Sequence, residues 1–101
     1  MGRVVAEVTV VPLGTGSASL SAYVAEVEKV LKDYPRLTSM LTPMSTILEG
    51  DMDEVMAAAK AMHDVPFRMG ALRVSTTLRI DDRRDKKISM AGKLAAVRKK
   101  M

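Results

Sequence analysis

Hydrophobic and polar residues alternate along residues 3–12, RVVAEVTVVP, and again along residues 72–81, LRVSTTLRID. Side chains at alternate positions of a strand point to opposite faces, so each segment is predicted to form a β-strand with one apolar face. Residues 37–49 contain two further short runs, LTSMLT and STILE, joined through Pro43-Met44. This arrangement predicts a tight connection between two antiparallel strands.

Three other segments show apolar residues at three- and four-residue spacing, which predicts helices. The first runs from Leu20 to Tyr34 before Pro35, and either Ser17 or Ser19 is expected to cap it. The second begins at Asp51, which with Glu54 resembles a capping box, and ends at Gly70. Pro66 is expected to kink or shorten that helix. The third stripe consists of Met90, Leu94, Val97 and Met101.

The order βαββαβ, followed by one more helix, predicts an α+β, ferredoxin-like fold with residues 1–101 in a single domain. Two helices would cover one face of a four-stranded antiparallel sheet, and the other face would stay open. The open face is expected to carry Val5, Glu7, Thr9, Val11, Arg73, Ser75, Thr77 and Arg79. Such a mixed surface suits an oligomer interface with a small ligand pocket. The last helix is expected to pack on a neighbouring subunit.

Composition narrows the classes of function. The 101 residues include no cysteine, which excludes disulfides, thiol catalysis and thiolate metal sites. No apolar run has membrane-spanning length, and the strand pattern starts too early for a signal peptide, so a cytoplasmic protein without a membrane partner is expected. The net charge of +4 lies mainly in Arg83–Lys87 and the C-terminal tail. With three aromatic rings, the chain has little to stack on nucleic-acid bases, so no nucleic-acid partner is expected.

The loop PLGTGS at residues 12–17 precedes a helix and raises the possibility of phosphate binding. It lacks the Lys-Ser/Thr of a P-loop and the third glycine of a dinucleotide fingerprint, so a turn between strand and helix is the favoured interpretation. His63 is the only histidine and is expected to be a buried, hydrogen-bonded side chain. No metal site, catalytic triad or resident cofactor is expected.

Two carboxylates are the best candidates for ligand binding. Glu7 is predicted on the open sheet face and Glu49 at a strand end. Either carboxylate can pair across strands with Arg73 or Arg79, or can bind a cationic or amino-bearing ligand, and the sequence leaves both interpretations open. Thr9, Thr46 and Thr77 would supply hydroxyl groups, although threonine is also common in strands.

Three stretches carry a resemblance to a known family: AEVTVVPLGTGSASLSAYV at 6–24, LTPMSTILEGDMDEVM at 41–56 and RVSTTLRIDDRRDK at 73–86. Together they resemble the thiamine-binding protein family. The resemblance implies a ferredoxin-like fold, homodimers whose sheets associate and that commonly form a homotetramer, and non-catalytic binding of thiamine or its hydroxymethylpyrimidine part. It marks Gly14, Gly16, Ser17, Thr46, Glu49, Gly50, Arg73, Thr77, Asp81, Asp82 and Arg83. Ser45 departs from the glycine that the family pattern leads us to expect.

Combining the two kinds of argument, we expect an oligomeric thiamine- or pyrimidine-binding protein that is not an enzyme. The expected ligand-binding residues are Glu7, Thr9, Ser17, Thr46, Glu49 and Thr77. Thiamine carries a thiazolium cation and an aminopyrimidine, which fit a carboxylate, hydroxyl groups and an apolar surface such as Met44 or Tyr23. The alternative is a structural or regulatory oligomer that binds another small molecule or an anion.

Overall fold

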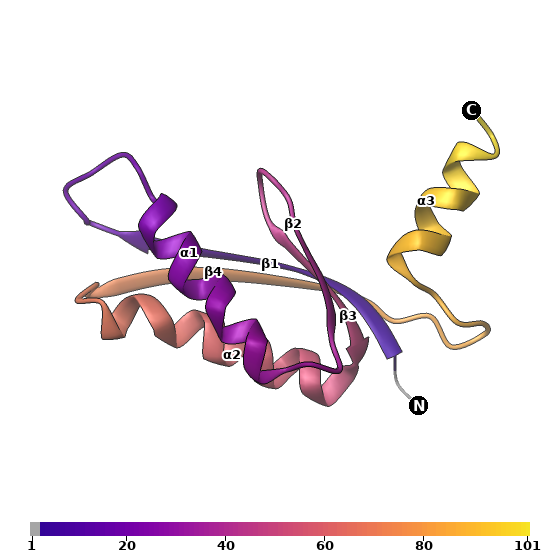
Figure 1. Ribbon diagram of the computed structural model, residues 1–101, viewed down its shortest axis with the longest axis horizontal. Coiled ribbons are helices and arrows are strands. Elements are labelled where there is room, and N and C mark those ends of the chain that lie inside the picture. Colours follow the sequence, from indigo (N-terminus) through magenta and orange to yellow (C-terminus); the bar gives the residue numbers. More distant parts are fainter. Residues whose placement is uncertain (1–2) are drawn as a thin grey trace.

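The computed structural model, which describes residues 3–101, has the predicted α+β architecture (Figure 1). A four-stranded antiparallel sheet has the strand order β2-β3-β1-β4. The strands are β1 (Arg3–Leu13), β2 (Thr38–Leu41), β3 (Thr46–Asp51) and β4 (Arg73–Asp81). The helices are α1 (Ser21–Lys29), the short 3₁₀ helix η1 (Val30–Asp33), α2 (Met52–Arg68) and α3 (Met90–Arg98). This order is the ferredoxin-like one, with α3 added at the C-terminal end.

The register of β1 fixes which residues share a face of the sheet. Val8 pairs with Thr46 of β3 and with Leu78 of β4, and these residues lie on the face that α1 and α2 cover. The core between sheet and helices is made of buried aliphatic side chains and one methionine, among them Val4, Val8, Val27, Leu48, Val55 and Met62. Glu7, opposite Ile47 and Arg79, lies on the open face, as the alternation predicted.

The first helix differs from the prediction at both ends. It begins at Ser21 after Leu20, and no side chain caps it. Ser17 instead accepts a hydrogen bond from the Ser19 N–H inside the loop, so this hydroxyl shapes the turn and not the helix start. At the other end the chain tightens into η1 before Pro35. The helical pattern was therefore correct, but the capping residues were wrong.

The second helix has the predicted start and end. The Asp51 side chain accepts hydrogen bonds from the N–H groups of Asp53 and Glu54, which satisfies two free donors of the first turn. Glu54 does not complete a capping box and instead forms an ion pair with Arg36. Pro66 does not end the helix, which continues to Arg68 with Pro66 buried in its last turn.

The third helix stands apart from the sheet and its two covering helices (Figure 1). Ser89 caps it by accepting a hydrogen bond from the Gly92 N–H. None of its nine residues is buried, and Leu94, Val97 and the following Met101 are exposed. Among residues 3–101, no helix is long and apolar enough to cross a membrane.

Candidate functional site

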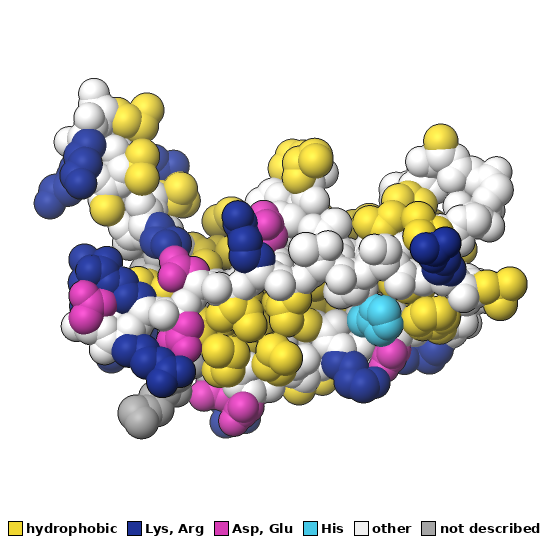
Figure 2. Space-filling model, turned by 180° about the vertical axis from the view of Figure 1, so that it is seen from behind, with side chains coloured by type: hydrophobic (Ala, Val, Ile, Leu, Met, Phe, Trp, Pro, Cys, Tyr) yellow, Lys and Arg dark blue, Asp and Glu magenta, His cyan; other side chains and the backbone are white. Residues whose placement is uncertain are grey.

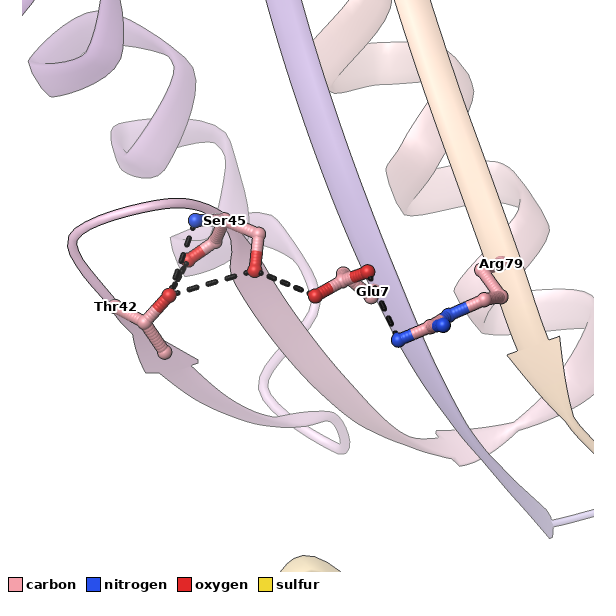
Figure 3. Close-up of polar contacts among 4 residues, drawn as sticks. All are labelled: Glu7, Thr42, Ser45 and Arg79. Carbon is pink, nitrogen blue, oxygen red and sulfur yellow. Dashed lines mark hydrogen bonds and ion pairs between the residues drawn. The ribbon is translucent and has the colours of Figure 1, made fainter.

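The predicted carboxylate Glu7 lies in a polar chain across the open face (Figure 3). Ser45 Oγ donates to Glu7 Oε2 at 3.0 Å, and Arg79 forms an ion pair with Glu7 Oε1 at 3.2 Å. Ser45 is held in turn by Thr42, whose Oγ1 donates to the Ser45 carbonyl and accepts from its N–H. Both oxygens of Glu7 therefore have protein partners. The ion pair with Arg79 is the cross-strand pairing that was one of the two interpretations left open by the sequence.

The second predicted carboxylate, Glu49, anchors the third helix. Its Oε1 accepts from the Met90 N–H at 2.6 Å, and its Oε2 accepts from the Arg3 guanidinium at 3.3 Å. The side chain is nearly buried between these partners, at the point where the chain leaves the sheet for α3. Its cationic partner is Arg3, not the Arg73 or Arg79 expected from the sequence.

A cleft of about 660 Å³ lies between the open face and α3. Glu7 and Arg79 line its polar side, and Ile47, Met90 and Leu94 are among its apolar lining residues. Lys93 of α3 forms an ion pair with Asp81 at the end of β4, which helps hold α3 beside this cleft.

A second, smaller pocket of about 110 Å³ lies on the other side of the sheet, between α1 and the turn that joins β2 and β3. Its walls include the apolar side chains of Val24, Val27 and Met62. Thr46, which is 5% exposed, donates from Oγ1 to Glu28 Oε2 at 2.7 Å. Glu28 Oε1 has no hydrogen-bond partner among residues 3–101, so this oxygen is available to accept from a ligand.

The six residues predicted for the site do not form one cluster. Thr46 and Glu49 face opposite sides of the sheet, because Thr46 pairs with Val8 and Glu49 with Val5. Thr9 and Thr77 are paired across the open face, and Thr9 also lines the smaller pocket. Ser17 lies exposed in the loop after β1, where Gly14 and Gly16 adopt the positive φ angles of a tight turn. Thr46 and Glu49 therefore do not line the same side of the sheet, and a ligand contact of either residue stays a prediction.

The remaining polar candidates have partners within the chain. Arg83 and Arg84 pair with Asp85 and Asp82, respectively, and the hydrogen bond from Arg83 lowers the pKa of the Asp85 carboxyl. His63 is half-buried and its Nδ1 lies 2.6 Å from Thr76 Oγ1, which confirms a hydrogen-bonded role. Within residues 3–101, no three His, Asp or Glu side chains converge in a way that could hold a metal ion.

Glu28 is the residue that the sequence interpretation missed. It lies four residues after Val24 and three before Leu31, so it falls within the apolar stripe of the first helix. A carboxylate on the core-facing side of a helix is uncommon unless it has a partner. Its position in that stripe was the sequence signal that could have identified Glu28. Its partner could not be predicted in the same way, because Thr46 lies 18 residues later in the sequence, on β3.

Comparison with known proteins places this architecture in a family. The model of the thiamine-binding protein family matches residues 6–98. The UPF0045 protein YqgV of Bacillus subtilis is 45% identical over 98 residues, with 94% of each chain covered. The crystal structure of MJ1052 from Methanocaldococcus jannaschii is 42% identical and has a TM-score of 0.86 over 96% of this chain and 97% of its own.

A more distant structure shares the fold alone. It is a Thermotoga maritima protein whose name refers to thiamine biosynthesis or salvage, with 20% identity and a TM-score of 0.76 over 94% of this chain and 98% of its own. The family match and the close relatives extend over nearly the whole chain and include both sides of the sheet described above. The chain therefore belongs to the thiamine-binding protein family.

Proposed function

We propose that this protein binds thiamine or a related hydroxymethylpyrimidine compound, without catalysis, and that the aminopyrimidine ring occupies the smaller pocket. The observation that carries the proposal is the Glu28 carboxylate, which is fixed by Thr46 through one oxygen and is free at the other. An amino group on the ring can donate to that oxygen while the ring contacts the apolar walls. Family membership makes thiamine the first ligand to test.

The size of the pocket supports a single ring. An apolar cavity of about 150 Å³ can hold benzene, so an open pocket of about 110 Å³ suits one six-membered ring whose substituents project outward. Met44, at the turn and 84% exposed, is placed to cover the projecting part. Methionine is well suited to such a contact because its side chain is flexible and polarizable.

The charge of the pocket supports a ligand that is not phosphorylated. Glu28 is the single charged side chain among the described residues that line it. A carboxylate at the wall favours an amino-bearing or cationic ligand and repels an anion. We therefore expect thiamine and hydroxymethylpyrimidine to bind more tightly than thiamine diphosphate.

Calorimetric titration of Glu28→Gln tests the site. A charge-assisted hydrogen bond contributes about 1.5 to 3 kcal/mol, so the substitution should weaken thiamine binding about tenfold to a hundredfold. Gln retains an oxygen that can accept from Thr46, which limits the effect on folding. Glu26→Gln is the matched control, because Glu26 lies on the same helix but pairs with exposed Lys29.

Two results would contradict the proposal in different ways. Unchanged affinity in Glu28→Gln would move the ligand elsewhere, with the open-face cleft beside Glu7 as the next site to test. If the wild-type protein bound none of the three compounds, the function itself would be wrong, and the alternative of an oligomer with another small-molecule ligand would take its place.

Self-association is the second part of the proposed function. The open face and the adjoining α3 carry half-buried and exposed apolar side chains, including Met40 of β2 and Leu94 of α3, next to ion pairs that a second copy could cover. Sheets with one uncovered, partly apolar face commonly bury it against another molecule. We therefore include a homodimer, and a homotetramer built from two of them, in the proposal.

A further inference from the structure

The turn that joins β2 to β3, residues 42–45, borders both cavities of the sheet. Thr42 lines the smaller pocket and also the open-face cleft, whereas Met44 and Ser45 line the pocket. The turn is closed by its own hydrogen bonds: the Thr42 N–H donates to the Ser45 carbonyl at 2.8 Å, and the Thr42 hydroxyl accepts from the Ser45 N–H at 3.0 Å. A change in this turn therefore alters the mouth of the pocket.

Ser45 and Thr46 attach this corner of the sheet to opposite faces. Thr46, the first residue of β3, lies on the helix-covered face, and its hydroxyl donates to Glu28 of α1 at 2.7 Å. Ser45 precedes it, and its hydroxyl donates to Glu7 of β1 on the open face at 3.0 Å. A single peptide unit thus connects a carboxylate of the open face with the carboxylate that we place beside the ligand.

The contact between Ser45 and Glu7 is the step of this polar chain that matters most for the turn. Arg79 pairs with the other oxygen of Glu7 at 3.2 Å (Figure 3), but its side chain is 79% exposed, and exposed ion pairs contribute little. Ser45 is half-buried, and its bond goes to a charged acceptor, which makes such bonds stronger than those between neutral groups. Loss of this bond should therefore loosen the turn.

We propose that Glu7 and Ser45 are positioning residues for the ligand of the smaller pocket, although Glu7 lines the cleft on the other side of the sheet. Their hydrogen bond holds the β2–β3 turn in the conformation that shapes the pocket mouth and directs the Thr46 hydroxyl, which in turn orients Glu28. The inference rests on the proposed function for the identity of the ligand. The order of the turn, however, can be measured without a ligand.

The expected size of the effect follows from the population of the ordered turn. Apparent affinity falls in proportion to the fraction of molecules in the binding-competent conformation. Loss of one hydrogen bond to a charged acceptor shifts a local equilibrium about tenfold or more. The bonds made by Thr42 remain and keep part of the population ordered. We therefore expect thiamine affinity to fall about three- to tenfold.

Amide exchange in the ligand-free protein, followed by nuclear magnetic resonance, measures the turn directly. In Glu7→Ala and in Ser45→Ala, protection of the Thr42 and Ser45 N–H groups should fall about tenfold. Ser45→Thr keeps a hydroxyl that can donate to Glu7, so it should retain the protection of the wild-type protein. Circular dichroism checks that each variant is folded.

Thr76→Val is the matched control for the loss of a side-chain hydrogen bond elsewhere in the sheet. Thr76 Oγ1 lies 2.6 Å from His63 Nδ1, which connects β4 to α2. Figure 2 shows His63, the cyan side chain, beside hydrophobic side chains, and neither residue lines the smaller pocket or the open-face cleft. This variant should melt at a lower temperature, with the protection of the turn and the thiamine affinity unchanged.

Calorimetric titration then connects the turn to the pocket. Glu7→Ala and Ser45→Ala should each weaken thiamine binding about three- to tenfold. The double variant should bind no more weakly than the weaker of the two, because both substitutions remove the same contact. Additive losses would show that the two residues act separately and would overturn the proposal.

The other outcomes separate this proposal from the proposed function. Unchanged protection of the turn in Glu7→Ala and Ser45→Ala would overturn the positioning role, and weaker thiamine binding by Glu7→Ala would then indicate direct contact in the open-face cleft. Lower protection with unchanged affinity would also overturn it, because the turn would not govern the pocket. A wild-type protein that binds none of the three compounds would overturn the proposed function and, with it, any role of Glu7 toward that ligand.

Discussion

Three glutamates of this chain show how partners decide the role of a side chain. Glu7 has both oxygens engaged by Ser45 and Arg79, Glu49 is shared between Arg3 and the Met90 N–H, and Glu28 keeps one oxygen free. The alternation of β1 was enough to place Glu7 on the open face. The role of Glu49 could not be predicted, because its partner Met90 lies 41 residues away and is brought near by the path of the chain after β4.

The contacts of Glu49 lead to a prediction for Glu49→Ala. The substitution removes the acceptor for the Met90 N–H and the ion pair with Arg3, so α3 should detach more often from the sheet. Loss of one charge-assisted hydrogen bond corresponds to about tenfold or more in that local equilibrium. Hydrogen exchange at Met90–Lys93 should therefore become faster, with thiamine affinity nearly unchanged. Weaker thiamine binding at unchanged exchange would instead restore Glu49 as a ligand contact.

At the level of the elements, the sequence predicted the strands and helices well and their ends less well. Apolar periodicity depends on burial, so all four strands and the three main helices follow from it. Helix ends depend on local hydrogen bonds that several residues can make. Thus Ser17 and Ser19 were plausible caps, but Ser17 accepts from the Ser19 N–H inside the loop and the Ser19 hydroxyl contacts the Ser21 hydroxyl, so neither caps α1. Pro66 lies in the last turn of α2 and does not end the helix, which continues to Arg68.

The end of α2 provides a test at this scale. Gly70 has a φ of 102°, its N–H donates to the Phe67 carbonyl, and the Ala71 N–H donates to the Pro66 carbonyl, which is a Schellman motif. Gly70→Ala should lower the free energy of unfolding by about 1 to 2 kcal/mol, because the left-handed region is costly for a side chain. No atom lies within 4 Å of the added Cβ, so the cost would come from the backbone alone.

Urea denaturation of Gly70→Ala and Gly70→Asn measures that cost. Asparagine tolerates the left-handed region better than alanine, so Gly70→Asn should lose less stability. Equal stability of alanine and glycine at this position would show that the motif does not hold the end of the helix.

The single chain is more extended, and exposes more surface, than a compact monomer of its size. The chain measures 44 × 31 × 19 Å, and its radius of gyration of 14.7 Å exceeds the value of about 13 Å typical of a compact chain of this length. It exposes 6918 Å² of surface, whereas a compact monomer of 11.0 kDa exposes about 5,600 Å². The projecting α3 accounts for part of the difference (Figure 1), and the open face beside it is the surface that we propose to be covered by self-association.

If α3 takes part in the proposed self-association, its outer apolar side chains should contact another subunit. Val97 is 59% exposed in the single chain, so Val97→Glu should barely change the stability of the subunit. A buried, unpaired carboxylate would, however, disfavour the interface between subunits. Light scattering should then show an assembly of lower mass than that of the wild-type protein. Lys99→Glu is the control for charge at an exposed position just after α3. Retention of the full mass in Val97→Glu would show that this side of α3 faces solvent in the assembly.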